Sequence, residues 1–161
     1  MRFTDGLDVV TPSGIREVLD EASRRGFALY VLDTDGRADR ESFFHAVRET
    51  LPLDPPLTSS RSWDALADSL WEGLRTETSG SSRVVVVWRD VVTPDGAAEE
   101  DFRTALEVLG DVAGSLADPG ITGGAPKHVP VRVAVGPRHG STATATATAE
   151  DTGDRVYPRP A

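Results

Sequence analysis

The chain contains no cysteine and only one lysine, Lys127, among its 161 residues. The absence of cysteine excludes disulfides and thiolate chemistry, and it fits a protein of the cytosol. No uninterrupted apolar run approaches 18 residues, so we expect no segment that spans a membrane. Residues 1–6 also lack the apolar core of a secretion signal. These absences together predict a cytoplasmic protein.

Positive charge is scarce as well, with 17 Lys and Arg against 26 Asp and Glu and a net charge of -9. Residues 1–136 hold 14 basic and 23 acidic residues, and 14 − 23 = −9, so the excess lies wholly in this part. An acidic surface repels nucleic acid and attracts basic proteins, although acidity also serves solubility alone. The three histidines have no acidic or nucleophilic partner at a useful spacing. We therefore expect no metal, no cofactor and no nucleic-acid partner.

Apolar runs alternate with segments of helical periodicity along most of the chain. The runs at 27–32, 84–88 and 129–135 are typical of strands buried on both faces. Helices are expected at 12–26, 39–52, 62–75 and 97–119, where apolar residues recur three and four apart. This alternation predicts an α/β fold, a three-stranded parallel sheet packed with helices. Pro130, near the start of the third run, indicates an edge strand.

The pattern divides the chain into three parts. Residues 1–26 are expected to form an N-terminal helical extension, and residues 27–136 the α/β domain. Residues 137–161 show no core pattern, and threonine alternates with alanine from 142 to 149. Side chains this small bury little area, so we expect a mostly disordered C-terminal tail.

The helix expected over 62–75 separates two kinds of surface. At 100° per residue its large apolar side chains face one side, and Asp64, Asp68 and Glu72 form a stripe roughly opposite. Carboxylates four residues apart repel each other by a few tenths of a kcal/mol, and packing does not require them. The stripe suits a surface that presents negative charge to a positive partner. An ordinary solvated helix face is the alternative.

The same helix carries a family resemblance. The segment Trp63-Asp64-Ala65-Leu66-x-Asp68-x-Leu70, followed by the apolar strand at 84–88, resembles the barstar family, the intracellular protein inhibitors of ribonucleases. The resemblance covers roughly residues 27–136 and begins near Tyr30-Val31-Leu32-Asp33. It implies a barstar-like fold and an inhibitor rather than an enzyme. The implied partner is a small basic ribonuclease, bound in a 1:1 complex.

The resemblance also implies roles for individual carboxylates. In the family, the carboxylate at the position of Asp68 enters the nuclease active site, where an RNA phosphate would sit. The position of Asp64 supports that contact, and Asp111 falls where the family has a peripheral acidic contact. A rigid carboxylate accepts the same bidentate hydrogen bonds that a nuclease gives to phosphate. An ordinary surface aspartate remains the alternative for Asp111.

The loop before this helix departs from the family's pattern. The family has an aromatic pair and a glycine there, which plug the nuclease cleft, whereas this chain reads Thr58-Ser59-Ser60 before Arg61. Two further aromatic contact positions are Ala67 and Gly73. Trp71 lies about 20° from Asp64 on the helical wheel and is the candidate replacement.

The expected partner surface therefore combines this loop with the acidic helix face and one position on the last helix: Thr58, Ser60, Arg61, Asp64, Ala67, Asp68, Trp71 and Asp111. Large aromatic anchors are what a tight interface usually contains, and here they are missing. Their absence leaves a second interpretation open. The chain would then be a barstar-like module that binds a non-ribonuclease toxin or a regulatory partner.

A third interpretation is enzymatic. Asp33-Thr34-Asp35-Gly36 ends a buried strand and resembles the first motif of haloacid-dehalogenase-type phosphatases, in which Asp33 would be the nucleophile, Asp35 a general acid and Mg²⁺ the cofactor. That chemistry needs a cationic partner and further carboxylates. The only lysine is Lys127, and no acidic pair accompanies Asp90. A turn that ends a strand explains the motif without catalysis.

Overall fold

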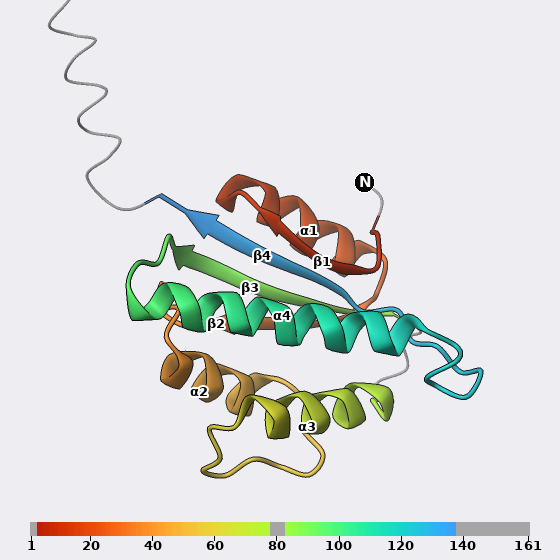
Figure 1. Cartoon of the computed structure of the whole chain (residues 1–161). Helices are drawn as coiled ribbons and strands as arrows, with labels where there is room; N and C mark the ends of the chain where they lie inside the picture. Colours follow the sequence, from red (N-terminus) through yellow and green to blue (C-terminus); the bar gives the residue numbers. More distant parts are fainter. Residues whose placement is uncertain (1–2, 78–82, 138–161) are drawn as a thin grey trace, which may run out of the picture.

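The computed structural model describes residues 3–77 and 83–137. The elements are, in chain order, β1 (Gly6–Val10), α1 (Pro12–Arg24), β2 (Ala28–Asp33), α2 (Arg40–Thr50), α3 (Trp63–Arg75), β3 (Val84–Val92), α4 (Ala97–Ala117) and β4 (Pro130–Gly136). The strands form one parallel sheet in the order β1-β4-β3-β2. Helix α1 covers one face of the sheet, and α2, α3 and α4 lie on the other (Figure 1).

Two hydrophobic cores lie on the two faces of this sheet. Successive residues of a strand point to opposite faces, so Val86 and Trp88 belong to the larger core under α2, α3 and α4. Val85 and Val87 belong to the smaller core under α1. Both faces of β3 are therefore covered, which explains why residues 84–88 form a continuous apolar run.

Side-chain caps set where three of the helices begin. Thr11, Asp39 and Ser62 accept hydrogen bonds from backbone N–H groups in the first turns of α1, α2 and α3. Such caps satisfy donors that have no partner within the helix. The Ser62 cap also determines which residues stand in the first turn of α3, and Asp64 is one of them.

The α/β prediction with a parallel sheet is confirmed, but the sheet has four strands rather than three. The additional strand, β1, lies in the segment that was predicted to hold only a helix. It is five residues long with Asp8 at its centre, so its sequence lacks the continuous apolar run of the other strands. It forms by pairing with β4, from Gly6 opposite Pro130 to Val10 opposite Ala134.

The prediction that Pro130 marks an edge strand is wrong. Strand β4 lies between β1 and β3, and Pro130 is its first residue, a position that tolerates proline. The edges of the sheet are β1 and β2. Apart from Pro137, the predicted tail lies outside the described residues. Within the described ranges, every helix is too short or too polar to cross a membrane.

Candidate functional site

Helix α3 presents Asp64 and Asp68 to solvent. Its opposite face is buried in the larger core, where Leu66 and Leu70 are 0% and 1% exposed. Within the described ranges, neither aspartate forms a hydrogen bond or an ion pair. Two uncompensated negative charges therefore stand on the exposed side of a helix that its own core holds in place.

The acidic stripe ends after Asp68, because its third carboxylate is compensated from within the chain. The guanidinium of Arg75 donates to Glu72 over 2.6 Å from Nη2 and 3.0 Å from Nε. The hydrogen bond from Arg75 lowers the pKa of Glu72, and the arginine charge adds to this effect. Glu72 is thus less available to a partner than the two aspartates.

Asp68 and Asp111 line the same hollow, of about 200 Å³, between α3 and α4. Its lining residues are Ala67, Asp68, Trp71, Asp111, Val112, Ser115 and Ile121. The hollow thereby brings together Ala67, Asp68, Trp71 and Asp111, four of the eight residues predicted for the partner surface. The arrangement combines two exposed carboxylates with the more deeply buried apolar side chains of Ala67, Trp71 and Val112.

The hollow also contains features that the sequence analysis missed. Ile121, in the loop after α4, is 56% exposed, and it and Val9 are the exposed large hydrophobic side chains of the described residues. A large aliphatic residue within the polar segment Pro119-Gly120-Ile121-Thr122-Gly123 was the available signal. The indole Nε1 of Trp71 is buried and has no hydrogen-bond partner among the described residues.

The C-terminal end of the loop before α3 is held against α2 by a hydrogen bond and an ion pair. Arg48 donates to the carbonyl oxygen of Ser60 over 2.7 Å, and Arg61 forms an ion pair with Glu41 over 3.1 Å. Thr58 is exposed. Thr58, Ser60 and Arg61 are outside the hollow between α3 and α4. A partner would therefore have to extend beyond the hollow to reach them.

Gly73 explains one departure from the family's pattern. It is buried, and a Cβ at this position would lie 2.1 Å from the carbonyl oxygen of Pro52. The start of the loop is also held to α3 by a hydrogen bond from Asp54 N to the carbonyl oxygen of Ser69, 3.0 Å long. Position 73 faces the chain's own loop, so it does not present a side chain to a partner.

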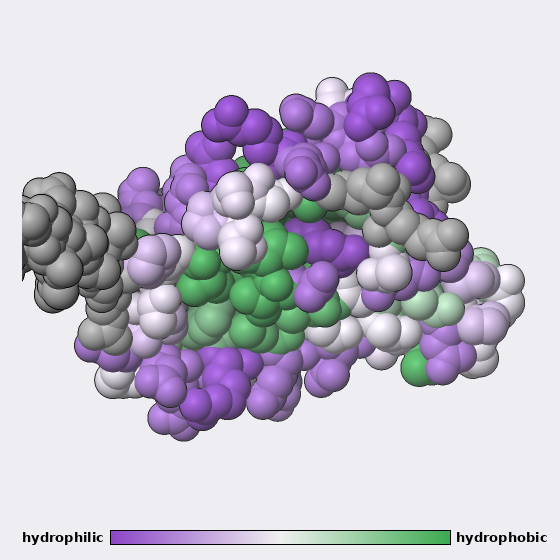
Figure 2. Space-filling model, turned by 90° about the horizontal axis from the view of Figure 1, so that it is seen from above, coloured by the Kyte–Doolittle hydropathy of each residue, from purple (hydrophilic) through white to green (hydrophobic). Residues whose placement is uncertain are grey.

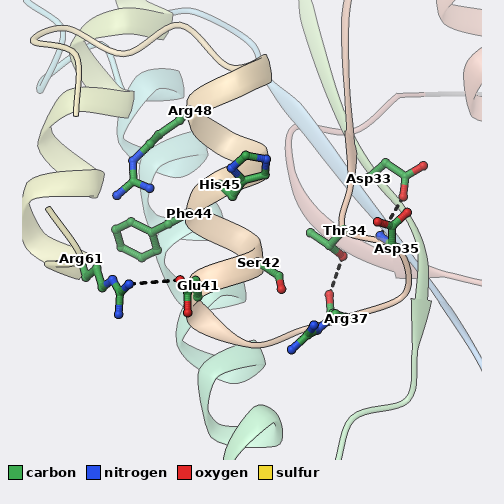
Figure 3. A pocket seen from close by; sticks show the side chains of 10 residues that line it. All are labelled: Asp33, Thr34, Asp35, Arg37, Glu41, Ser42, Phe44, His45, Arg48 and Arg61. Atoms are coloured by element: carbon green, nitrogen blue, oxygen red, sulfur yellow. Dashed lines mark hydrogen bonds and ion pairs between the residues drawn. The ribbon is translucent and has the colours of Figure 1, made fainter. Parts of the chain in front are cut away.

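A second hollow, of about 360 Å³, lies beside α2 at the carboxyl end of β2 and includes Asp33 and Asp35 (Figure 3). Asp33 accepts hydrogen bonds from the Asp35 backbone N–H over 3.0 Å and from Arg89 over 3.2 and 3.3 Å. The first of these bonds, together with Arg89, holds the pKa of Asp33 below its usual value. The carboxylate is therefore already engaged on both oxygens.

This geometry does not favour the phosphatase interpretation. A nucleophilic aspartate needs a free oxygen, and Mg²⁺ needs several oxygen ligands. No group of three or more His, Cys, Asp or Glu side chains suited to a metal occurs in the described part of the chain. The Asp33-Thr34-Asp35-Gly36 segment instead forms the turn after β2, where Thr34 accepts a 3.1 Å hydrogen bond from the indole of Trp88.

Comparison with known proteins identifies the family. The model of the family described as barstar (barnase inhibitor) matches residues 27–132, from the residue before β2 into β4. No curated protein and no solved structure matches the chain. The matched segment contains the loop before α3, the two exposed aspartates of α3 and the hollow that α3 shares with α4. Strand β1 and helix α1 precede it. The chain belongs to the barstar family.

Proposed function

We propose that this chain is a stoichiometric inhibitor of a small basic ribonuclease, and that it protects the cytoplasm by forming a 1:1 complex. The observation that carries the proposal is the pair of exposed carboxylates of Asp64 and Asp68, which have no ion pair among the described residues. They stand on a helix whose opposite face is buried, inside the segment that the barnase-inhibitor family model matches. The chain's role in this proposal is occlusion rather than catalysis.

The proposed mechanism follows from charge and rigidity. A ribonuclease holds RNA phosphate with basic side chains, and the Asp68 carboxylate accepts the same hydrogen bonds. Since α3 is fixed by its core face and its Ser62 cap, little conformational entropy is lost when Asp68 is bound. Asp64 and Asp111 add attraction, Ala67 and Trp71 supply apolar contact, and the loop with Thr58, Ser60 and Arg61 covers the cleft.

The test is inhibition of RNA cleavage by a panel of small basic ribonucleases, with stoichiometry measured by calorimetry. We expect a 1:1 complex with at least one enzyme. Removing one partner of a buried charge pair costs about 2–5 kcal/mol, so Asp68→Asn should weaken binding by roughly 30-fold or more. The matched control is Asp20→Asn, an exposed aspartate on α1 with the same charge change. Equal losses in the two variants would contradict the proposed role of Asp68.

One observation favours a second candidate function. The loop has no aromatic residue at 58–61, and Gly73 faces inward, so the large anchors of a tight ribonuclease interface are absent. The same surface would then serve a barstar-like module that binds a non-ribonuclease toxin or a regulatory protein. Lack of inhibition across the whole panel, by a folded chain, is the result that would favour this alternative.

A further inference from the structure

Strand β1 lies at an edge of the sheet, and within residues 3–77 and 83–137 β4 is its only neighbouring strand. Native proteins usually protect such an edge with lysine, proline, a bulge or a covering element. The sequence of β1, Gly-Leu-Asp-Val-Val, contains neither lysine nor proline, and its one charged side chain, Asp8, repels an acidic strand but not a basic one. Its pairing with β4 runs in unbroken register from Gly6 to Val10. The outer side of β1 is thus a regular template for one more strand.

The α4 side of this edge is apolar. Val9 is 49% exposed, and Leu7, two residues earlier and on the same face, is partly buried against the larger core. Figure 2 shows an apolar patch on this side of the molecule, surrounded by hydrophilic surface. Contiguous apolar surface with a polar rim is typical of a binding site. An added strand would cover Val9 with its own apolar side chains.

The α1 side of the edge holds two exposed carboxylates beside apolar side chains and Arg132. Helix α1 connects β1 to β2 at the opposite edge of the sheet, and a hollow of about 460 Å³ remains beside β1. Asp8 and Glu17 line this hollow, are exposed and have no ion pair within the described ranges. Arg132, which lies opposite Asp8 in the register of β1 and β4, also lines it. Its buried guanidinium donates to the carbonyl oxygens of Thr4, Gly6 and Val131 and interacts with the charge of Asp8.

We propose that β1 binds an extended segment of a partner protein as a fifth strand, with apolar and basic side chains in alternation. Apolar side chains would cover Leu7 and Val9, and basic ones would face Asp8 and Glu17. Backbone hydrogen bonds would supply affinity, and the alternation of apolar and basic side chains would supply specificity, as in other cases of strand addition. No residue of β1 lines the hollow between α3 and α4, so the inference does not depend on the ribonuclease proposal.

Charge argues against a second copy as the occupant. Antiparallel pairing of β1 with itself, centred on the strand, would place Asp8 opposite Asp8 of the other copy, and like charges directly opposite are destabilising. Each chain also carries a net charge of -9, which opposes self-association. The same negative charges attract a basic segment. The partner we infer is therefore a basic protein with an exposed, alternating strand-forming segment.

The probe is a blocked peptide of alternating lysine and valine, titrated into the ¹⁵N-labelled full chain. We expect shifts and slowed hydrogen exchange at amides of residues 6–10. A glutamate–valine peptide, and a lysine–valine peptide methylated on alternate backbone nitrogens, should bind at least tenfold more weakly. Equal binding of the methylated peptide, or no response to the lysine–valine peptide at millimolar concentration, would overturn the proposal.

Variants of the protein complete the test. Val9→Lys should reduce peptide binding at least tenfold, whereas Ile121→Lys, at the other exposed large hydrophobic, should not change it. Asp8→Lys should reverse the preference toward the glutamate–valine peptide, which a merely unfolded variant cannot do. Any ribonuclease inhibition should be unchanged in Val9→Lys. If the free chain instead dimerises and Val9→Lys abolishes the dimer, the edge belongs to a second copy and the proposal is wrong.

Discussion

At position 73 the backbone of the preceding loop takes the space that a side chain would otherwise fill. The carbonyl group of Pro52 approaches so closely that a Cβ would lie 2.1 Å from its oxygen and 2.5 Å from its carbon. Those atoms belong to the backbone, and a hydrogen bond from Asp54 N to the carbonyl oxygen of Ser69 also holds the loop to α3. Gly73 therefore sets how near the loop lies to the helix that carries Asp64 and Asp68.

Gly73→Ala should destabilise the fold by about 1–3 kcal/mol, because the added methyl group forces the loop away from α3. Gly114→Ala is the control: Gly114 is exposed in α4, and a Cβ there would have no neighbour within 4 Å. Alanine at that helical site should stabilise the fold by about 0.5–1 kcal/mol. Urea unfolding of both variants measures the two effects. Similar midpoints for the two variants would show that the close approach to Pro52 does not matter.

At the scale of elements, the sequence predicts what depends on local pattern and misses what depends on distant pairing. The helices of the matched domain follow from caps such as Asp39 and Ser62 and from apolar spacing. Strand β1 cannot be predicted in this way, because Asp8 interrupts its short apolar stretch and the strand forms by pairing with the distant β4. In the same way, helical periodicity places Asp68 outward, but only the packing of α4 brings Asp111 and Ile121 beside it.

Helix α1 ends in an ion-pair cluster that makes a prediction about pH. Glu21 is only 7% exposed, and both Arg24 and Arg25 donate to it. The hydrogen bond from Arg25 is the main cause of the lowered pKa of Glu21, whose ordinary value is 4.5. A carboxyl pKa that is lower in the folded state contributes stability above about pH 4.5, and that contribution is lost as the pH falls through the native-state pKa.

Glu21→Gln should therefore lower the free energy of unfolding at pH 7, and its difference from the parent chain should be smaller at pH 3, because more of the native carboxyl is then protonated. Urea unfolding at both pH values measures this. Glu17→Gln, an exposed position on the same helix, is the control and should give a small difference that does not depend on pH in this way. A Glu21→Gln effect of the same size at both pH values would contradict the ion-pair explanation.

At the scale of the whole molecule, negative charge is distributed unevenly over the surface. The net charge of -9 comes from residues 1–136. Asp64, Asp68 and Asp111, which have no ion pair within the described ranges, are exposed on the surface formed by α3 and α4. A field of this kind raises the rate at which a basic partner arrives, and the barnase–barstar pair is itself the standard example. Its range shortens as salt is added, to about 10 Å at 0.1 M.

For a ribonuclease that this chain inhibits, the association rate constant should fall at least tenfold between about 10 mM and 500 mM NaCl. The dissociation rate constant should change much less, because contacts already formed exclude salt. Stopped-flow fluorescence measures both constants. An association rate that does not respond to salt would show that the acidic surface does not guide the encounter.

The pairing of β1 with β4 also constrains when the protein folds. Gly6 pairs with Pro130, so β1 cannot pair with β4 until nearly all of the described chain has been synthesised. Contacts this distant along the chain slow folding, since a long loop must close first. On the ribosome, a nascent chain that stops short of β4 leaves Trp88 and the rest of β3 open along one edge. The sheet is therefore completed only after β4 has been synthesised, and until then the valine-rich strand β3 has an unpaired edge that favours aggregation.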